Sequence, residues 1–109
     1  MPTIQPIHAF SDNFIWMITT AGSNSATVVD PGDAGPVIDR LRAEGLTLGA
    51  ILVTHKHSDH IGGIPRLLQA WPGIPVYGPA DEPIPTLTHR LQDGDRIEPP
   101  ELGVEFEVM

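Results

Sequence analysis

The sequence predicts an α/β fold in which helices flank a mixed β-sheet. Two observations support this prediction. Apolar and β-branched runs of strand length alternate with stretches whose apolar residues recur at helical spacing, and only a short polar stretch separates two of the early strands. The 12 prolines and 11 glycines among 109 residues indicate short elements joined by many turns. Because this length suits one small domain, we expect residues 1–109 to form a single domain.

The N-terminal part is predicted to form neighbouring strands. Thr3–Ile7 fits a first strand, and Phe14–Thr20 is a β-branched and aromatic run of strand length. A small polar stretch then turns the chain, and Ala26–Asp30 reads as a returning strand that Pro31-Gly32 ends. We therefore expect Phe14–Thr20 and Ala26–Asp30 to pair as a hairpin.

Two amphipathic helices are predicted on either side of a buried strand. Apolar residues recur at helical spacing in Gly35–Glu44, and Gly45 stands where a helix commonly stops. Leu48–Thr54 is an almost continuous apolar run, which is typical of a strand buried on both faces. Helical spacing returns in Ile61–Trp71, and Pro72-Gly73 ends that stretch. The predicted order is strand, helix, strand, helix.

The C-terminal part is predicted to contain short strands. Pro75–Tyr77 fits one of them. Thr88–Leu91 and Arg96–Glu98 flank Asp93-Gly94, a signature of tight hairpin turns, so we expect these two strands to face each other across the turn. Apolar and acidic residues alternate in Gly103–Met109, as in a half-buried strand.

The charge and composition argue against several classes of partner. A formal net charge of -8 without a cluster of Lys or Arg disfavours nucleic acid and anionic membranes. The N-terminus lacks the features of a signal peptide, and no stretch is long enough to span a bilayer, so we expect a cytoplasmic protein. Because the chain has no Cys, a transition-metal site would use His and carboxylates.

One segment concentrates potential metal ligands between the buried strand and the second helix. It reads Thr54-His55-Lys56-His57-Ser58-Asp59-His60-Ile61-Gly62-Gly63. His55 and His57 are two residues apart, so in an extended loop both imidazoles can hold one metal ion, and Asp59 and His60 can hold a second where the chain turns. Imidazole nitrogen and carboxylate oxygen suit Zn, Fe or Mn. The alternative is a polar surface loop, which the clustering of three His and one Asp disfavours.

Gly62 and Gly63 follow the potential ligands and fall in the first turn of the predicted helix. Glycine costs up to ~1 kcal/mol there relative to alanine. We therefore expect backbone or ligand to approach closely at these two positions.

The His-rich segment resembles the T-H-x-H-x-D-H-x-G-G signature of the metallo-β-lactamase superfamily. Further stretches resemble the hydroxyacylglutathione hydrolase (glyoxalase II) branch: Asp12-Asn13-Phe14-Ile15-Trp16, Val28-Val29-Asp30-Pro31-Gly32, and Leu87-Thr88-His89-Arg90 with the later turn Asp93-Gly94-Asp95. The similarity covers the whole chain. It implies the N-terminal half of an αββα sandwich, here a single partial domain.

The resemblance also implies a site and a reaction. His55 and His57 would bind one metal ion, and Asp59 and His60 the other, with two Zn in a complete site and Fe or Mn possible. A metal-held hydroxide, which Asp59 also orients, would attack the thioester of an S-lactoylglutathione-type substrate. Asp30 would support the ligand segment as a neighbouring group. For Asp30 the alternative is a turn-forming residue before Pro-Gly.

The family's remaining ligands are expected beyond Met109, so the resemblance suggests a truncated N-terminal half that is inactive alone. Its exposed C-terminal strand would then favour self-association. Two other interpretations stay open: another enzyme of the superfamily (a persulfide dioxygenase, a lactonase or a generic thioesterase), or a non-catalytic fragment. His8 and His89 fit surface or strand positions better than ligand positions, and Trp16 and Trp71 are expected in the core.

Overall fold

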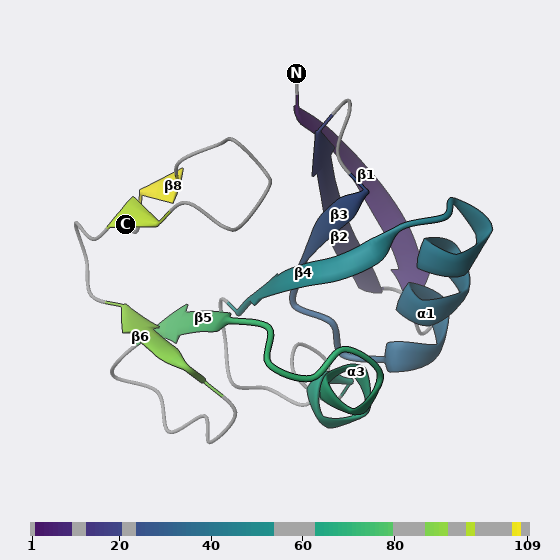
Figure 1. Ribbon diagram of the computed structural model, residues 1–109. Coiled ribbons are helices and arrows are strands. Elements are labelled where there is room, and N and C mark those ends of the chain that lie inside the picture. Colours follow the sequence, from purple (N-terminus) through teal and green to yellow (C-terminus); the bar gives the residue numbers. More distant parts are fainter. Residues whose placement is uncertain are drawn as a thin grey trace.

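The computed structural model describes residues 2–9, 13–20, 24–53, 63–79, 87–91, 96–97 and 106–107 (Figure 1). Within these residues, six strands form one sheet, and their order across it follows their order along the chain. They are β1 (Pro2–Ala9), β2 (Asn13–Thr20), β3 (Ser25–Val29), β4 (Thr47–Leu52), β5 (Val76–Pro79) and β6 (His89–Leu91). The helices are α1 (Ala34–Ala43) and α3 (Ile64–Ala70), and β7 (Arg96–Ile97) pairs with β8 (Phe106–Glu107) in a second, two-stranded sheet.

The six-stranded sheet is mixed, as the sequence predicts. β1 pairs with β2 and β2 with β3 in antiparallel register, which confirms the expected hairpin. From β3 to β6 the neighbouring strands are parallel. Parallel neighbours need a crossover, and α1 lies between β3 and β4 in the chain as α3 does between β4 and β5. The α/β prediction with flanking helices is therefore confirmed.

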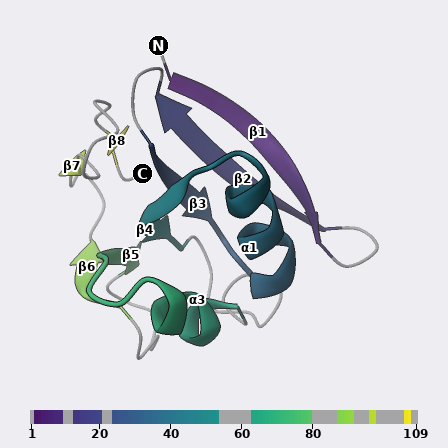
Figure 2. The same cartoon turned by 45° about the vertical axis from the view of Figure 1, so that its right-hand side comes forward.

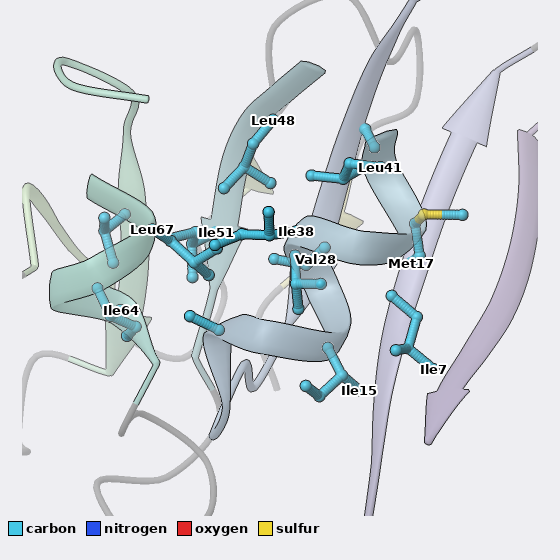
Figure 3. Packing of buried hydrophobic residues seen from close by; sticks show 14 of the residues in the cluster. Ile7, Ile15, Met17, Val28, Ile38, Leu41, Leu48, Ile51, Ile64 and Leu67 are labelled. Atoms are coloured by element: carbon cyan, nitrogen blue, oxygen red, sulfur yellow. The ribbon is translucent and has the colours of Figure 1, made fainter. Parts of the chain in front are cut away.

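Both helices lie on the same face of this sheet (Figures 1 and 2). Their apolar residues join one cluster with alternate residues of the strands, because successive side chains of a strand point to opposite faces. Figure 3 shows the cluster, in which the largest fully buried side chains include Ile15, Met17, Leu41, Ile51 and Leu67. This helix-covered face is the hydrophobic core.

Helix α1 begins and ends at residues that fit those positions. The carboxylate of Asp33 accepts a hydrogen bond from the amide of Gly35 at 3.1 Å and so caps the N-terminus. Val37, Ile38 and Leu41 form the buried stripe. Beyond the C-terminus, Gly45 has φ +67, a left-handed conformation that glycine adopts without strain.

Helix α3 starts later than the sequence pattern suggests. Gly63 occupies the position before the helix, and Pro65 lies in its first turn, where its missing N–H costs nothing. Ile64 and Leu67 are buried, and Trp71 is half-buried against the core. Ile61 and Gly62 lie outside the described residues.

The expected pairing of Thr88–Leu91 with Arg96–Glu98 is wrong for the residues that the structure describes. β6 instead adds to the edge of the large sheet beside β5, and β7 pairs with β8. Thr88 explains this preference, since its amide donates to the carbonyl of Val76 at 2.9 Å and its hydroxyl accepts from the Val76 amide at 2.8 Å. These two contacts fix β6 on β5.

The sheet face opposite the helices is less evenly buried. Trp16, expected in the core, is 45% exposed there, and Ile4 is 62% exposed. Trp16 follows the buried Ile15, so its side chain points to the other face of β2. No helix among the described residues is long and apolar enough to cross a membrane.

Candidate metal centre

The His-rich segment follows the carboxyl end of β4, one of the two inner strands of the parallel part of the sheet. β4 ends at Leu52, and the amide of Val53 donates to the carbonyl of Tyr77 on β5 at 2.8 Å. In α/β folds, ligands commonly bind beyond the carboxyl ends of parallel strands. The segment therefore leaves the sheet at an edge suited to binding.

The four predicted ligands, His55, His57, Asp59 and His60, lie outside the described residues. Their assignment stays a prediction from the sequence. Among the residues that the structure does describe, no three side chains of His, Cys, Asp or Glu gather closely enough to hold a metal ion.

Asp30 is the one predicted site residue that the structure describes. It is half-buried directly after β3, and its φ of 54 places it in the left-handed region, which Asp tolerates better than most residues. Its amide donates to the carbonyl of Leu52 at 2.8 Å, and its carbonyl accepts from the amide of Gly32 at 2.8 Å. The backbone of Asp30 thus forms the turn that the sequence suggests, beside the last residue of β4.

The exit of the His-rich segment meets the same turn. The amide of Gly63 donates to the carbonyl of Pro31 at 2.9 Å. Residues before and after the segment are therefore hydrogen-bonded to two consecutive residues, Asp30 and Pro31. The Asp30–Ala34 turn holds the entry and the exit together.

A second polar group, formed by Thr88 and His89, aligns with the end of β4 across the sheet. The hydroxyl of Thr88 lies 2.8 Å from Nδ1 of His89, whose ring centroid is 4.7 Å from that of Tyr77. The parallel register places Tyr77 beside both Leu52 and His89. The stretch Leu87-Thr88-His89 was a recognisable signal, but its contact with Tyr77 depends on strand pairing that sequence does not reveal. His89 is exposed, as expected of a strand residue.

The chemistry of the donor set fits a metal ion of the transition series. Three imidazoles and one carboxylate occur within six residues, and the chain has no thiol to compete. Zn²⁺ binds nitrogen and oxygen ligands of this kind, as do Fe and Mn.

Comparison with known proteins identifies the class. Residues 10–108 match the sequence profile of the metallo-beta-lactamase superfamily. The match covers nearly the whole chain, and the mixed sheet with helices on one face agrees with it. The chain belongs to the metallo-beta-lactamase superfamily.

Individual relatives narrow the similarity. A hydroxyacylglutathione hydrolase from Vibrio parahaemolyticus is 56% identical over 98 residues, which are 90% of this chain and 38% of that protein. The chain thus spans about two fifths of the length of this curated relative. A metallo-beta-lactamase from Staphylococcus aureus aligns at a TM-score of 0.68 and 21% identity, over 97% of this chain and 33% of that one. ETHE1 from Myxococcus xanthus aligns at a TM-score of 0.68 and 20% identity, over 88% of this chain and 43% of that one. These two structures support the fold.

Proposed function

We propose that this chain carries the first ligand segment of a metal-dependent thioester hydrolase that acts on glutathione thioesters of the S-lactoylglutathione type. The observation that carries the proposal is the 56% identity to a hydroxyacylglutathione hydrolase over a stretch that includes His55–His60. The position of that segment after β4, at the carboxyl edge of the parallel strands, supports it.

The proposed ligand sets divide the segment in two. His55 and His57 would hold one Zn, and Asp59 and His60 a second, with Fe or Mn as alternatives for the same donors. When bound, such ions lower the pKa of water and polarise a carbonyl. The catalytic part of Asp59 would be to accept a hydrogen bond from the attacking water and so orient it.

The reaction is a hydrolysis. Water oxygen bonds to the thioester carbonyl carbon, the carbon–sulfur bond breaks, and the sulfur leaves with a proton as glutathione, which leaves a hydroxy acid. Asp30 would act as a positioning residue, since its amide donates a hydrogen bond to the carbonyl of Leu52, two residues before the ligand segment begins.

A zinc titration tests the proposed site directly. We expect the 109-residue chain to bind Zn²⁺. The substitution His57→Ala should raise the dissociation constant at least about tenfold. His89→Ala is the matched control, because His89 is an exposed histidine that lies in β6 and outside the segment. Equal Zn²⁺ affinity in the wild type and His57→Ala would contradict the assignment.

Activity is tested in two forms of the protein. The resemblance implies ligands beyond the part of the relatives that matches this chain, so we expect residues 1–109 alone to hydrolyse S-lactoylglutathione slowly or not at all. Joining residues 1–109 to the remaining part of the Vibrio parahaemolyticus hydrolase should give an active chimera, and Asp59→Asn should abolish its turnover. Turnover of a lactone or a persulfide in preference to the thioester would instead favour another enzyme of the superfamily.

Two further expectations belong to the same proposal. A cytoplasmic location would suit a glutathione thioester as substrate. Self-association through the C-terminal strand also stays a prediction, and sedimentation velocity of the 109-residue chain checks it: a single monomeric species over a wide concentration range would contradict it.

A further inference from the structure

Gly63 has a backbone conformation that any residue can adopt, yet it has no room for a side chain. Its φ is -87 and its ψ is -9, which is ordinary right-handed helical geometry. A Cβ atom there would lie 2.5 Å from the amide nitrogen of Ala34 and 2.7 Å from both the carbonyl carbon of Asp33 and the carbonyl oxygen of Pro31. Glycine is therefore required by close packing and not by φ.

The atoms that Gly63 approaches cannot move aside easily. All three are backbone atoms of the Asp30–Ala34 turn. Asp33 in this turn caps α1, whose buried stripe packs against the sheet, and Asp30 is bonded to Leu52 at the end of β4. A side chain at position 63 would therefore displace the start of α3 and leave the turn in place.

The same turn holds both ends of the proposed ligand segment. The bond from Asp30 to Leu52 fixes the entry, and the bond from Gly63 to Pro31 fixes the exit. Closing a loop costs conformational entropy, and a loop whose ends are already fixed does not lose that entropy when it binds a ligand.

We propose that Gly63 is a positioning residue for metal binding: its contact with the Asp30–Ala34 turn closes the ligand segment before a metal ion arrives. This inference rests on the proposed metal site. It assigns the glycine a consequence beyond stability, because loss of the contact lowers the metal affinity of chains that are still folded.

Glycines elsewhere in the chain supply the control. A Cβ at Gly35, in the first turn of α1, would meet only Oδ1 of Asp33 at 3.6 Å, an ordinary contact. Gly35→Ala keeps the amide that donates to Asp33. It therefore adds the same methyl group as Gly63→Ala, on the helix that follows the turn. At position 35 this methyl group would not clash with any backbone atom.

The test is a Zn²⁺ titration of the 109-residue chain by competition with a chromophoric chelator, at a temperature where circular dichroism shows each variant folded. We expect Gly63→Ala to raise the dissociation constant for Zn²⁺ roughly 10- to 100-fold, which is the range for groups that support metal ligands. Gly35→Ala should stay within about twofold of the wild type, because its Cβ would make only an ordinary contact and would displace no backbone. A purely structural glycine would change the unfolding midpoint and leave the affinity of the folded chain unchanged, and that result would overturn the proposal.

Amide hydrogen exchange of the metal-free wild type adds a measurement that needs no variant. The Gly63 and Asp30 amides should be protected before any Zn²⁺ is added, because the proposal requires their hydrogen bonds to Pro31 and Leu52 in the metal-free chain. Exchange of the Gly63 amide at the rate of an unfolded chain would overturn the proposal. This test uses the wild type, so it holds even if Gly63→Ala does not fold. Failure of the wild type to bind Zn²⁺ would instead refute the proposed metal site, and with it the predicted effect on affinity. Equal binding by wild type and Gly63→Ala would refute only the role of Gly63.

Discussion

The two faces of the six-stranded sheet bury their residues by different means. On the helix-covered face, Ile15 is 1% exposed, and α1 and α3 complete one continuous cluster around it. On the opposite face, Trp16 is 45% exposed and Ile4 62%, although Ile18, on the same face, is only 5% exposed. Neighbouring residues of one strand can thus lie in very different surroundings.

This difference shows where local sequence determines burial. The helices that cover the first face each follow one of its strands in the chain, so their apolar stripes and the alternating strand residues are both visible in the sequence. No helix that the structure describes covers the opposite face, so these patterns do not predict which of its residues are buried.

The largest expected effect comes from emptying a site on the helix-covered face. Ile15→Ala should lower the free energy of unfolding by about 2–5 kcal/mol, because the side chain is fully buried and its neighbours close the cavity only partly. Urea unfolding followed by circular dichroism measures the change. A loss below about 1 kcal/mol would show that this face is loosely packed and would remove the contrast between the two faces.

A polar contact at the sheet edge should matter less than the core. Thr88→Val keeps the shape of the side chain but removes the hydroxyl that accepts from the Val76 amide. We expect the free energy of unfolding to fall by about 1–2 kcal/mol, since the amide of the buried Val76 loses this hydrogen-bond partner. Urea unfolding measures it, and Thr47→Val is a suitable control because the hydrogen bond from the Thr47 hydroxyl to the carbonyl of Asn24 is exposed and long, at 3.3 Å.

The helix cap tests the layer that covers the core. Asp33→Ala removes the acceptor for the Gly35 amide, so α1 should lose about 1 kcal/mol of stability. Thermal unfolding checks the change, and Asp33→Asn should recover most of it because the asparagine oxygen can accept the same bond. A similar loss in both variants would indicate that the charge of Asp33 matters more than the cap.

Much of the fold was predictable from local patterns. The hairpin, the mixed sheet, α1 and its stop at Gly45 follow from periodicity and turn chemistry, and the structure confirms them. The pairing of Thr88–Leu91 was wrong because the Asp93-Gly94 signal is local, whereas the bonds between Thr88 and Val76 join residues 12 apart. Trp16 was misplaced because strand alternation says that Ile15 and Trp16 point apart but not which face is covered.

The sequence predicts which residues make up the candidate site, but it says less about the backbone contacts that hold them. The ligands His55, His57, Asp59 and His60 come from the sequence alone and stay predictions. Close packing at Gly63 was expected from the unfavourable glycine, and the structure confirms it by identifying the Asp30–Ala34 turn as the surface it meets. That turn comes before β4 in the chain, so only the folded arrangement shows that it holds both ends of the segment.

The smallest effect is expected on the opposite face and completes the comparison. Ile4→Ala makes the same chemical change as Ile15→Ala, one strand away, but Ile4 is 62% exposed and already in contact with solvent. We expect the free energy of unfolding to change by no more than about 0.5 kcal/mol in urea. A loss similar to that of Ile15→Ala would mean that Ile4 is covered in solution, and sedimentation velocity would then show whether a second copy of the chain covers it. Because both substitutions remove the same atoms, the difference between them measures what the helices contribute to one face of the sheet.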